Sequence, residues 1–130
     1  MGNSNSLLNI KKYNFEDMQL ARQSNGNILI INTLDESLQE CIIPGTISIH
    51  AEVSLLNEQL NKDKTVSIVI YGKNHNDEKI ISKYQQLTSL GFSNIFIYPG
   101  GIFEWLLLQE IYGDDNFPTT IKEIDILKYR

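Results

Sequence analysis

The sequence predicts an α/β domain with a mostly parallel central sheet of about four to five strands and helices on both faces. Short apolar runs rich in β-branched residues alternate along the chain with longer segments whose apolar residues recur at helical spacing. Polar or glycine-containing turns separate these segments, and such alternation is typical of βαβ units. With 130 residues, the chain has room for one domain.

The first expected element is a short helix that follows Asn14. Asp17 lies three residues further on, which is the spacing of a helix N-cap with an acidic first turn. Asn25-Gly26 ends this helix, because both residues tolerate the left-handed backbone conformation. The next expected elements are a strand at 28–31, a strand at 46–49 entered through Pro44-Gly45, and a helix at 51–60.

The second half of the chain continues the alternation. Its expected elements are a strand at 66–71, a polar loop at 72–77, a helix at 78–90, a strand at 94–98 and a nearly all-apolar helix at 102–111. Gly91 caps the first of these helices. Tyr112 and Phe117 either cover the core or offer a partner surface, and the tail 121–130 forms either a last helical turn or an edge segment.

Composition and charge exclude several functional classes. Hydrophobic residues make up 42% and charged residues 21%, as in an ordinary soluble domain. A net charge of −5 argues against a nucleic-acid partner, because phosphates require a basic surface. No apolar run reaches the ~18–20 residues of a membrane span, and no secretory signal is visible. We therefore expect a cytoplasmic protein, either a monomer or a weak dimer.

The chain has one cysteine, Cys41. One cysteine forms no internal disulfide, no Cys-x-x-Cys redox pair and no cysteine-rich zinc site. Any thiol chemistry must therefore be carried by Cys41, and the alternative is a small buried apolar residue. No cluster of His, Asp and Glu has metal-ligand spacing, so the sequence predicts neither a metal nor a cofactor.

The loop that follows the strand at 66–71 is the first candidate binding site. Ligands of parallel α/β sheets bind at the carboxyl ends of the strands, and a helix N-terminus favours an anion. The candidate ligand-binding residues are Gly72, Lys73, Asn74, His75, Asn76, Asp77 and Lys79. For Asp77 a favourable interaction with the helix dipole is the simpler interpretation. His75 is interpreted as a solvated loop residue.

Four segments, taken in order, resemble the rhodanese-like domain over residues 15–112. They are residues 42–47 (IIPGTI), 68–71 (IVIY), 90–95 (LGFSNI) and 98–105 (YPGGIFEW). The resemblance implies a rhodanese-like fold at 13–130, with 1–12 a flexible segment and 113–130 a C-terminal extension. In the family's sulfurtransferases, a cysteine directly after the strand that corresponds to 66–71 accepts sulfur as a persulfide, and related phosphatases use a cysteine there too.

The resemblance implies that the family's nucleophile is missing here. The residue after the strand is Gly72, and the remainder of the loop contains no cysteine. The first strand of active members ends in Asp-Val-Arg, whereas here it ends in Asn32-Thr33-Leu34. We therefore expect a catalytically inactive binding or regulatory module, with an unknown protein or a small anion as its ligand. The alternative is an active sulfurtransferase that uses Cys41 or a thiol supplied by a partner.

The N-terminus carries a possible lipidation signal. Met1, Gly2 and Ser6 match the pattern Met-Gly-x-x-x-Ser for N-myristoylation, with the acyl chain on Gly2. One myristoyl chain gives only reversible membrane binding. A third hypothesis is therefore a membrane-peripheral adaptor anchored through Gly2. The alternative is a chance match to a short motif.

Overall fold

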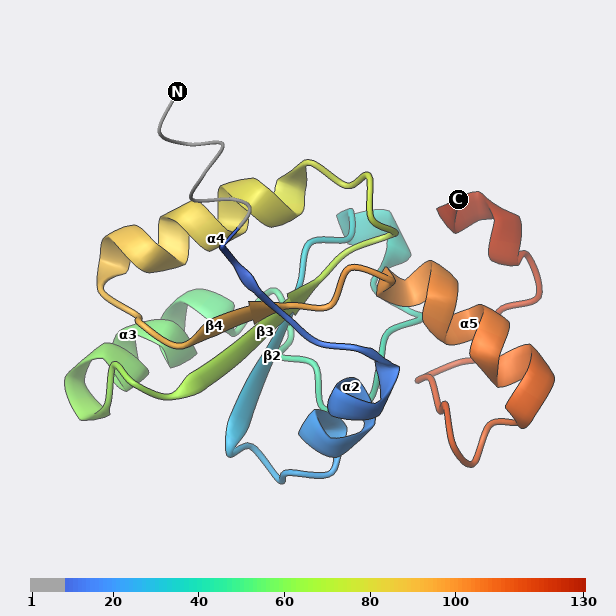
Figure 1. The fold of residues 1–130 in the computed structure, drawn as a ribbon, viewed down its shortest axis with the longest axis horizontal. Helices are drawn as coiled ribbons and strands as arrows, with labels where there is room; N and C mark the ends of the chain where they lie inside the picture. Colours follow the sequence, from blue (N-terminus) through green and yellow to red (C-terminus); the bar gives the residue numbers. More distant parts are fainter. Residues whose placement is uncertain (1–8) are drawn as a thin grey trace.

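Four parallel strands form the sheet of the computed structural model, which describes residues 9–130 (Figure 1). The strands are β1 (Lys11–Lys12), β2 (Ile28–Asn32), β3 (Ser67–Tyr71) and β4 (Ile95–Ile97). Their order in the sheet is β1-β4-β3-β2, and every neighbouring pair is parallel. The parallel α/β architecture predicted from the sequence is thus confirmed.

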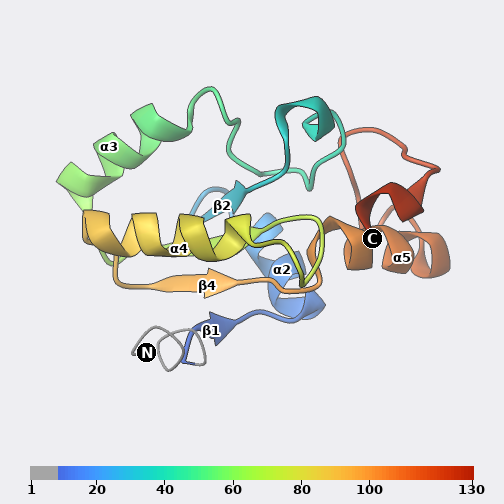
Figure 2. The ribbon, with the colours of Figure 1, turned by 90° about the horizontal axis from the view of Figure 1, so that it is seen from above.

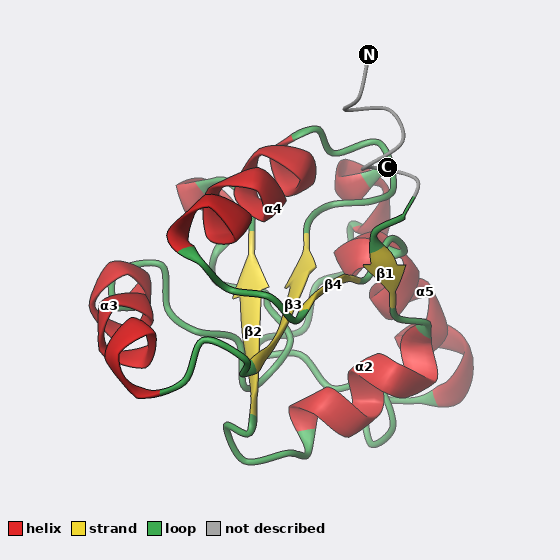
Figure 3. Ribbon diagram, turned by 60° about the vertical axis from the view of Figure 1, so that its left-hand side comes forward, coloured by secondary structure: helices red, strands yellow, loops and turns green. Residues whose placement is uncertain are grey.

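Helices cover both faces of the sheet. The α-helices are α2 (Phe15–Arg22), α3 (Glu52–Lys62), α4 (Lys79–Leu90) and α5 (Gly101–Tyr112), and two short 3-10 helices are η1 (Glu36–Leu38) and η2 (Ile126–Tyr129). Helices α2 and α5 pack on one face, while α3 and α4 pack on the other (Figures 2 and 3). Each of these α-helices begins and ends within a few residues of the bounds expected from the sequence.

The side chains of β3 show how one strand serves both layers. Val69 and Tyr71 belong to the apolar cluster under α2 and α5, whereas Ile68 and Ile70 belong to the cluster under α3 and α4. Successive side chains of a strand point to opposite faces, so a central strand covered on both sides must be apolar throughout. All four of these side chains are fully buried. The buried strand therefore fixes the position of residues 72–78 at the end of the sheet where the carboxyl termini of the parallel strands lie.

One expected strand is not formed. Residues 46–49 make a single parallel bridge, between Thr46 and Ile30, and no strand. The Thr46 hydroxyl donates to the Ile43 carbonyl at 2.6 Å and lies 2.8 Å from the Tyr71 hydroxyl. The Ile43 contact closes a turn, the Tyr71 hydroxyl holds that turn against β3, and the chain leaves the sheet after Ile47. The β-branched composition of the segment was therefore a misleading signal.

The N-terminal part of the chain adds a strand that the sequence did not predict. Lys11 and Lys12 lie in the segment expected to be flexible, but they form β1 by pairing with Phe96 and Ile97 of β4. Gly2, the expected site of acylation, lies outside the described residues. Within residues 9–130, no helix combines the length and the hydropathy that crossing a membrane requires.

Candidate functional site

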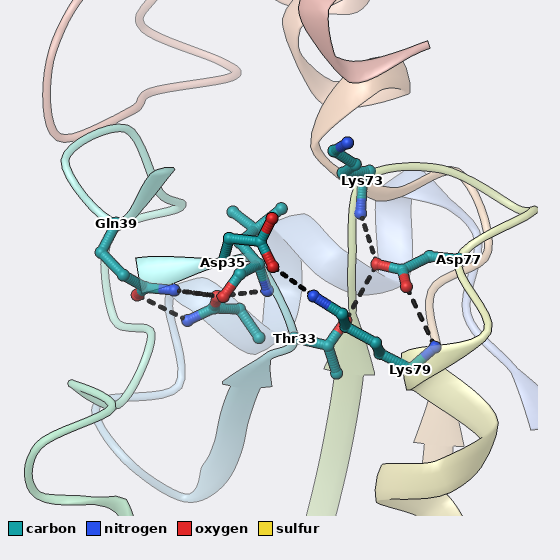
Figure 4. Close-up of polar contacts among 8 residues, drawn as sticks. Thr33, Asp35, Gln39, Lys73, Asp77 and Lys79 are labelled. Carbon is teal, nitrogen blue, oxygen red and sulfur yellow. Dashed lines mark hydrogen bonds and ion pairs between the residues drawn. The ribbon is translucent and has the colours of Figure 1, made fainter. Parts of the chain in front are cut away.

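The candidate site is the loop of residues 72–78, between the carboxyl end of β3 and the start of α4. The structure brings Lys73, Asp77 and Lys79 together with Thr33 and Asp35, which follow β2 (Figure 4). β2 and β3 are parallel neighbours, so their carboxyl ends meet at one edge. Asn74 and Asn76 line the cavity at the mouth of the same loop, whereas His75 lines a different one.

The carboxylate of Asp77 occupies the centre of this loop. Its Oδ2 accepts hydrogen bonds from the Thr33 hydroxyl at 3.1 Å and from the Lys73 backbone N–H at 3.2 Å. Its Oδ1 accepts from the Lys79 N–H at 3.0 Å, in the first turn of α4. The N–H donors of the loop thus face a negative charge, as is favourable at a helix N-terminus. This charge is the Asp77 carboxylate of the protein itself and not a bound anion.

Gly72 is needed for this arrangement. A Cβ atom at Gly72 would lie 2.3 Å from Asp77 Oδ2 and 2.6 Å from Thr33 Oγ1, closer than real carbon contacts allow. Gly72 is buried, and its backbone φ does not require glycine. Glycine therefore suits this position because it has no side chain, and the Asp77 carboxylate occupies the volume that a Cβ atom would fill.

The start of α5 holds the same loop from the other side. The N–H groups of Ile102 and Phe103 donate to the carbonyls of Gly72 and Lys73, each at 2.9 Å. Gly101 has a φ of +66°, and a Cβ there would lie 2.6 Å from the Gly72 carbonyl oxygen. The free N–H groups of α5 therefore bind the loop backbone.

Lys79 carries a side-chain cation beside the loop. Its ammonium forms an ion pair with the Asp35 carboxylate, across from Asp77. The hydrogen bond from Lys79 lowers the pKa of Asp35, and the Asp35 carboxylate in turn raises the pKa of Lys79. Both side chains are more than half exposed, so this pair contributes little to stability but sets the local charge pattern.

An open cavity of about 380 Å³ lies at the mouth of the loop. It is lined by Lys73, Asn74, Asn76, Asp77, Glu78, Lys79 and Arg130. The Asn74 amide donates to the Tyr129 carbonyl at 2.6 Å and so ties the loop to the C-terminal segment. His75 is exposed and lines a different, smaller cavity together with Ile10, Ile80 and Pro99. The predicted site residues are therefore divided between two surfaces.

The family follows from comparison of the sequence with known domains. Residues 17–108 match the family model of the rhodanese-like domain. This chain is a member of the rhodanese-like domain family. No match was found among curated proteins.

Solved structures show the same rhodanese-like fold. The Alr3790 protein from Anabaena sp. is similar with a TM-score of 0.59 and 21% identity, over 89% of this chain and 86% of that one. The Saccharomyces cerevisiae single-domain sulfurtransferase RDL2 has a TM-score of 0.56 and 21% identity, over 84% of this chain and 96% of its own. An uncharacterized S. cerevisiae protein has a TM-score of 0.58 and 20% identity, over 76% and 92%.

A polar network at the end of β2 was not predicted from the sequence. In this rhodanese-like domain, Asn32 is almost fully buried and its Oδ1 accepts from Gln39 Nε2 at 2.7 Å and from the Leu34 N–H at 2.9 Å. Asn32 Nδ2 donates back to Gln39 Oε1 at 3.1 Å. These neutral amides hold the turn beside the loop. The signal that could have found them is a polar residue at the end of an apolar strand.

Cys41 is not part of this loop and lies away from solvent. It is only 2% exposed and belongs to the apolar cluster under α2 and α5. Its thiol contacts the Ile121 carbonyl, with Sγ 3.6 Å from the oxygen, and burial raises the pKa of the thiol. A protonated, enclosed thiol is a poor nucleophile. Across residues 9–130 we also find no group of three His, Cys, Asp or Glu side chains that could hold a metal ion.

Proposed function

We propose that this rhodanese-like domain does not transfer sulfur and acts as a binding module. The observation that carries the proposal is the Asp77 carboxylate, which fills the space that any side chain at position 72 would need. The family resemblance assigns the nucleophilic cysteine to position 72. Here that position has no side chain, and the adjacent N–H donors of Lys73 and Lys79 are already bound to Asp77.

The alternative, an active sulfurtransferase with an atypical thiol, needs an accessible thiolate. Cys41 is the chain's one cysteine, and its burial and raised pKa both disfavour the thiolate. A thiol supplied by a partner would have to enter a loop centre that Asp77 occupies. Both points support a module without sulfurtransferase chemistry.

Assays of the purified chain test this part of the proposal. We expect no thiocyanate formation from thiosulfate and cyanide, and no hydrolysis of p-nitrophenyl phosphate, above the level of a Cys41→Ala variant. The reason is that neither reaction has a nucleophile in the loop. Turnover that disappears in Cys41→Ala would instead support the atypical-thiol alternative, and turnover shared by both proteins would require a different nucleophile.

The charge pattern at the loop mouth favours a peptide over a free anion. A small anion would have to displace the Asp77 carboxylate and its three hydrogen bonds. The cavity at the mouth, in contrast, is open, and its wall has three basic residues, Lys73, Lys79 and Arg130, against two acidic ones, Asp77 and Glu78. Asp77 is already hydrogen-bonded within the loop, so basic groups are in excess at the cavity wall. We therefore propose an acidic peptide segment of a partner protein as the ligand, with its carboxylates at this rim.

We test this rim, formed by Lys73, Lys79 and Arg130, with a fluorescein-labelled Glu-rich peptide. Its binding is followed by fluorescence anisotropy at low salt. We expect the Lys73→Gln/Arg130→Gln variant to bind at least about fivefold more weakly, because two cation–carboxylate contacts are lost, and salt to weaken the wild type similarly. Lys62→Gln/Lys64→Gln is the matched control, since it removes two exposed charges elsewhere. Equal losses in both variants would show attraction to net charge and would reject the rim as a site.

A further inference from the structure

The C-terminal segment, beyond the part of the chain that matches the family model, covers Cys41. The family match ends at residue 108, whereas the polar and charged groups beside the thiol come from residues 119–129. The Ile121 carbonyl contacts Sγ, and the side chains of Thr119, Glu123, Lys128 and Tyr129 lie near the thiol. Removing this segment would therefore uncover Cys41.

Thr120 anchors the near end of the segment firmly. Its N–H donates to the Ile42 carbonyl at 2.9 Å, and its hydroxyl donates to the Glu40 carbonyl at 2.5 Å. The same hydroxyl accepts from the Ile42 N–H at 3.0 Å. Backbone and side chain together thus fix one point, and the chain beyond it can move without disturbing these contacts.

Beyond Thr120, the Ile121 carbonyl accepts from the Thr119 hydroxyl and the Cys41 thiol, and Lys122 forms an exposed ion pair with Asp114. The fully buried attachment of the segment is Tyr129. Its ring is fully buried, and its carbonyl accepts the hydrogen bond from Asn74 in the loop. Between these points Ile124 is 86% and Leu127 58% exposed, and Ile126 is only partly buried. The Lys128–Glu123 ion pair lies within the segment. Segments with so few buried contacts open at a lower free energy than the whole domain.

We propose that residues 121–130 form a strap that opens locally about Thr120, with Tyr129 as its latch. Opening withdraws the Tyr129 ring from the core. This exposes to solvent both the apolar cavity that the ring had filled and the Cys41 thiol. Asn74 connects the strap to the loop, because its amide also accepts from the Asn76 N–H at 2.8 Å. A ligand that moves Asn74 would therefore shift the strap toward the open state. The opening itself does not depend on the proposed peptide ligand.

The single cysteine makes the opening measurable. The rate of Cys41 labelling by DTNB is recorded at increasing urea below the unfolding transition, beside global unfolding followed by circular dichroism. We expect wild-type labelling to be faster than global unfolding allows, with a much weaker dependence on urea, because opening the strap exposes little surface. Labelling that shares both the free energy and the urea dependence of global unfolding would overturn the strap.

Variants separate the latch from general destabilisation. We expect Asn74→Ala to raise the labelling rate about threefold to tenfold through loss of one hydrogen bond. Tyr129→Ala should raise it at least about tenfold through loss of a buried aromatic ring. Ile124→Ala, in the same strap but highly exposed, is the control and should label at the wild-type rate. Acceleration by Ile124→Ala equal to that by Asn74→Ala would also overturn the proposal.

Discussion

Replacing Gly101 by alanine is expected to lower the free energy of unfolding by about 3 kcal/mol or more. The residue has a φ of +66°, where an L side chain is strained, by about 1–3 kcal/mol. The added Cβ would also lie 2.6 Å from the Gly72 carbonyl oxygen and 2.7 Å from that of Lys73. These are backbone atoms, so relief requires moving the loop and weakening its hydrogen bonds to Ile102 and Phe103.

Gly26 provides the matched control for this prediction. Its φ is +87°, but a Cβ there would meet no atom within 4 Å. Gly26→Ala should therefore cost only the backbone strain, about 1–2 kcal/mol. Urea unfolding of both variants measures the difference, which we expect to be at least about 1 kcal/mol. Equal costs for Gly101→Ala and Gly26→Ala would show that the approach of α5 to the loop is not sterically limiting.

Introducing a cysteine at position 72 should destabilise the domain unless Asp77 is removed. In a Cys41→Ala background, we expect Gly72→Cys to cost about 1–2 kcal/mol, because the Asp77 carboxylate and the Thr33 hydroxyl must move away from the Cβ and lose hydrogen bonds. Adding Asp77→Gly should recover part of this loss. The coupling in the double-mutant cycle should be at least about 1 kcal/mol. A Gly72→Cys cost that is the same with and without Asp77 would contradict the steric role of the carboxylate.

The reactivity of the new thiol provides a second measurement. With Asp77 present, the carboxylate beside the sulfur disfavours the thiolate, since a neighbouring negative charge raises a thiol pKa. Without it, the N–H groups of Lys73 and Lys79 are free to face the sulfur and should lower that pKa. The pH profile of iodoacetamide alkylation should therefore shift to lower pH in Gly72→Cys/Asp77→Gly. An unshifted profile would mean that the loop no longer directs its N–H donors inward.

Local signals in the sequence were sufficient for most of the elements. Asn14 and Asp17 form the reciprocal capping box of α2, and Gly91 ends α4 with a φ of +112°. These contacts join residues only three or four positions apart, so the pattern along the chain contains them. The four segments of the resemblance likewise identified the family that the model over residues 17–108 shows.

Sheet pairing was less accessible from the sequence. β1 is two lysines, with no β-forming pattern, and it exists because Phe96 and Ile97 of β4 offer an open edge. Residues 46–49 have the composition of a strand, but Thr46 bonds to Ile43 and Tyr71 and turns the chain away. Strand formation at an edge depends on which partner is present, and propensity alone does not contain that information.

The sequence by itself determined the α/β architecture, the family and the presence of a glycine directly after β3. Only the tertiary structure decided what occupies the space beside that glycine and what covers the one thiol. Thr33 bonds Asp77 across 44 positions, and Cys41 meets Ile121 across 80. The direction of a side chain in a loop depends on such distant partners, which come together only when the sheet and the C-terminal segment have packed.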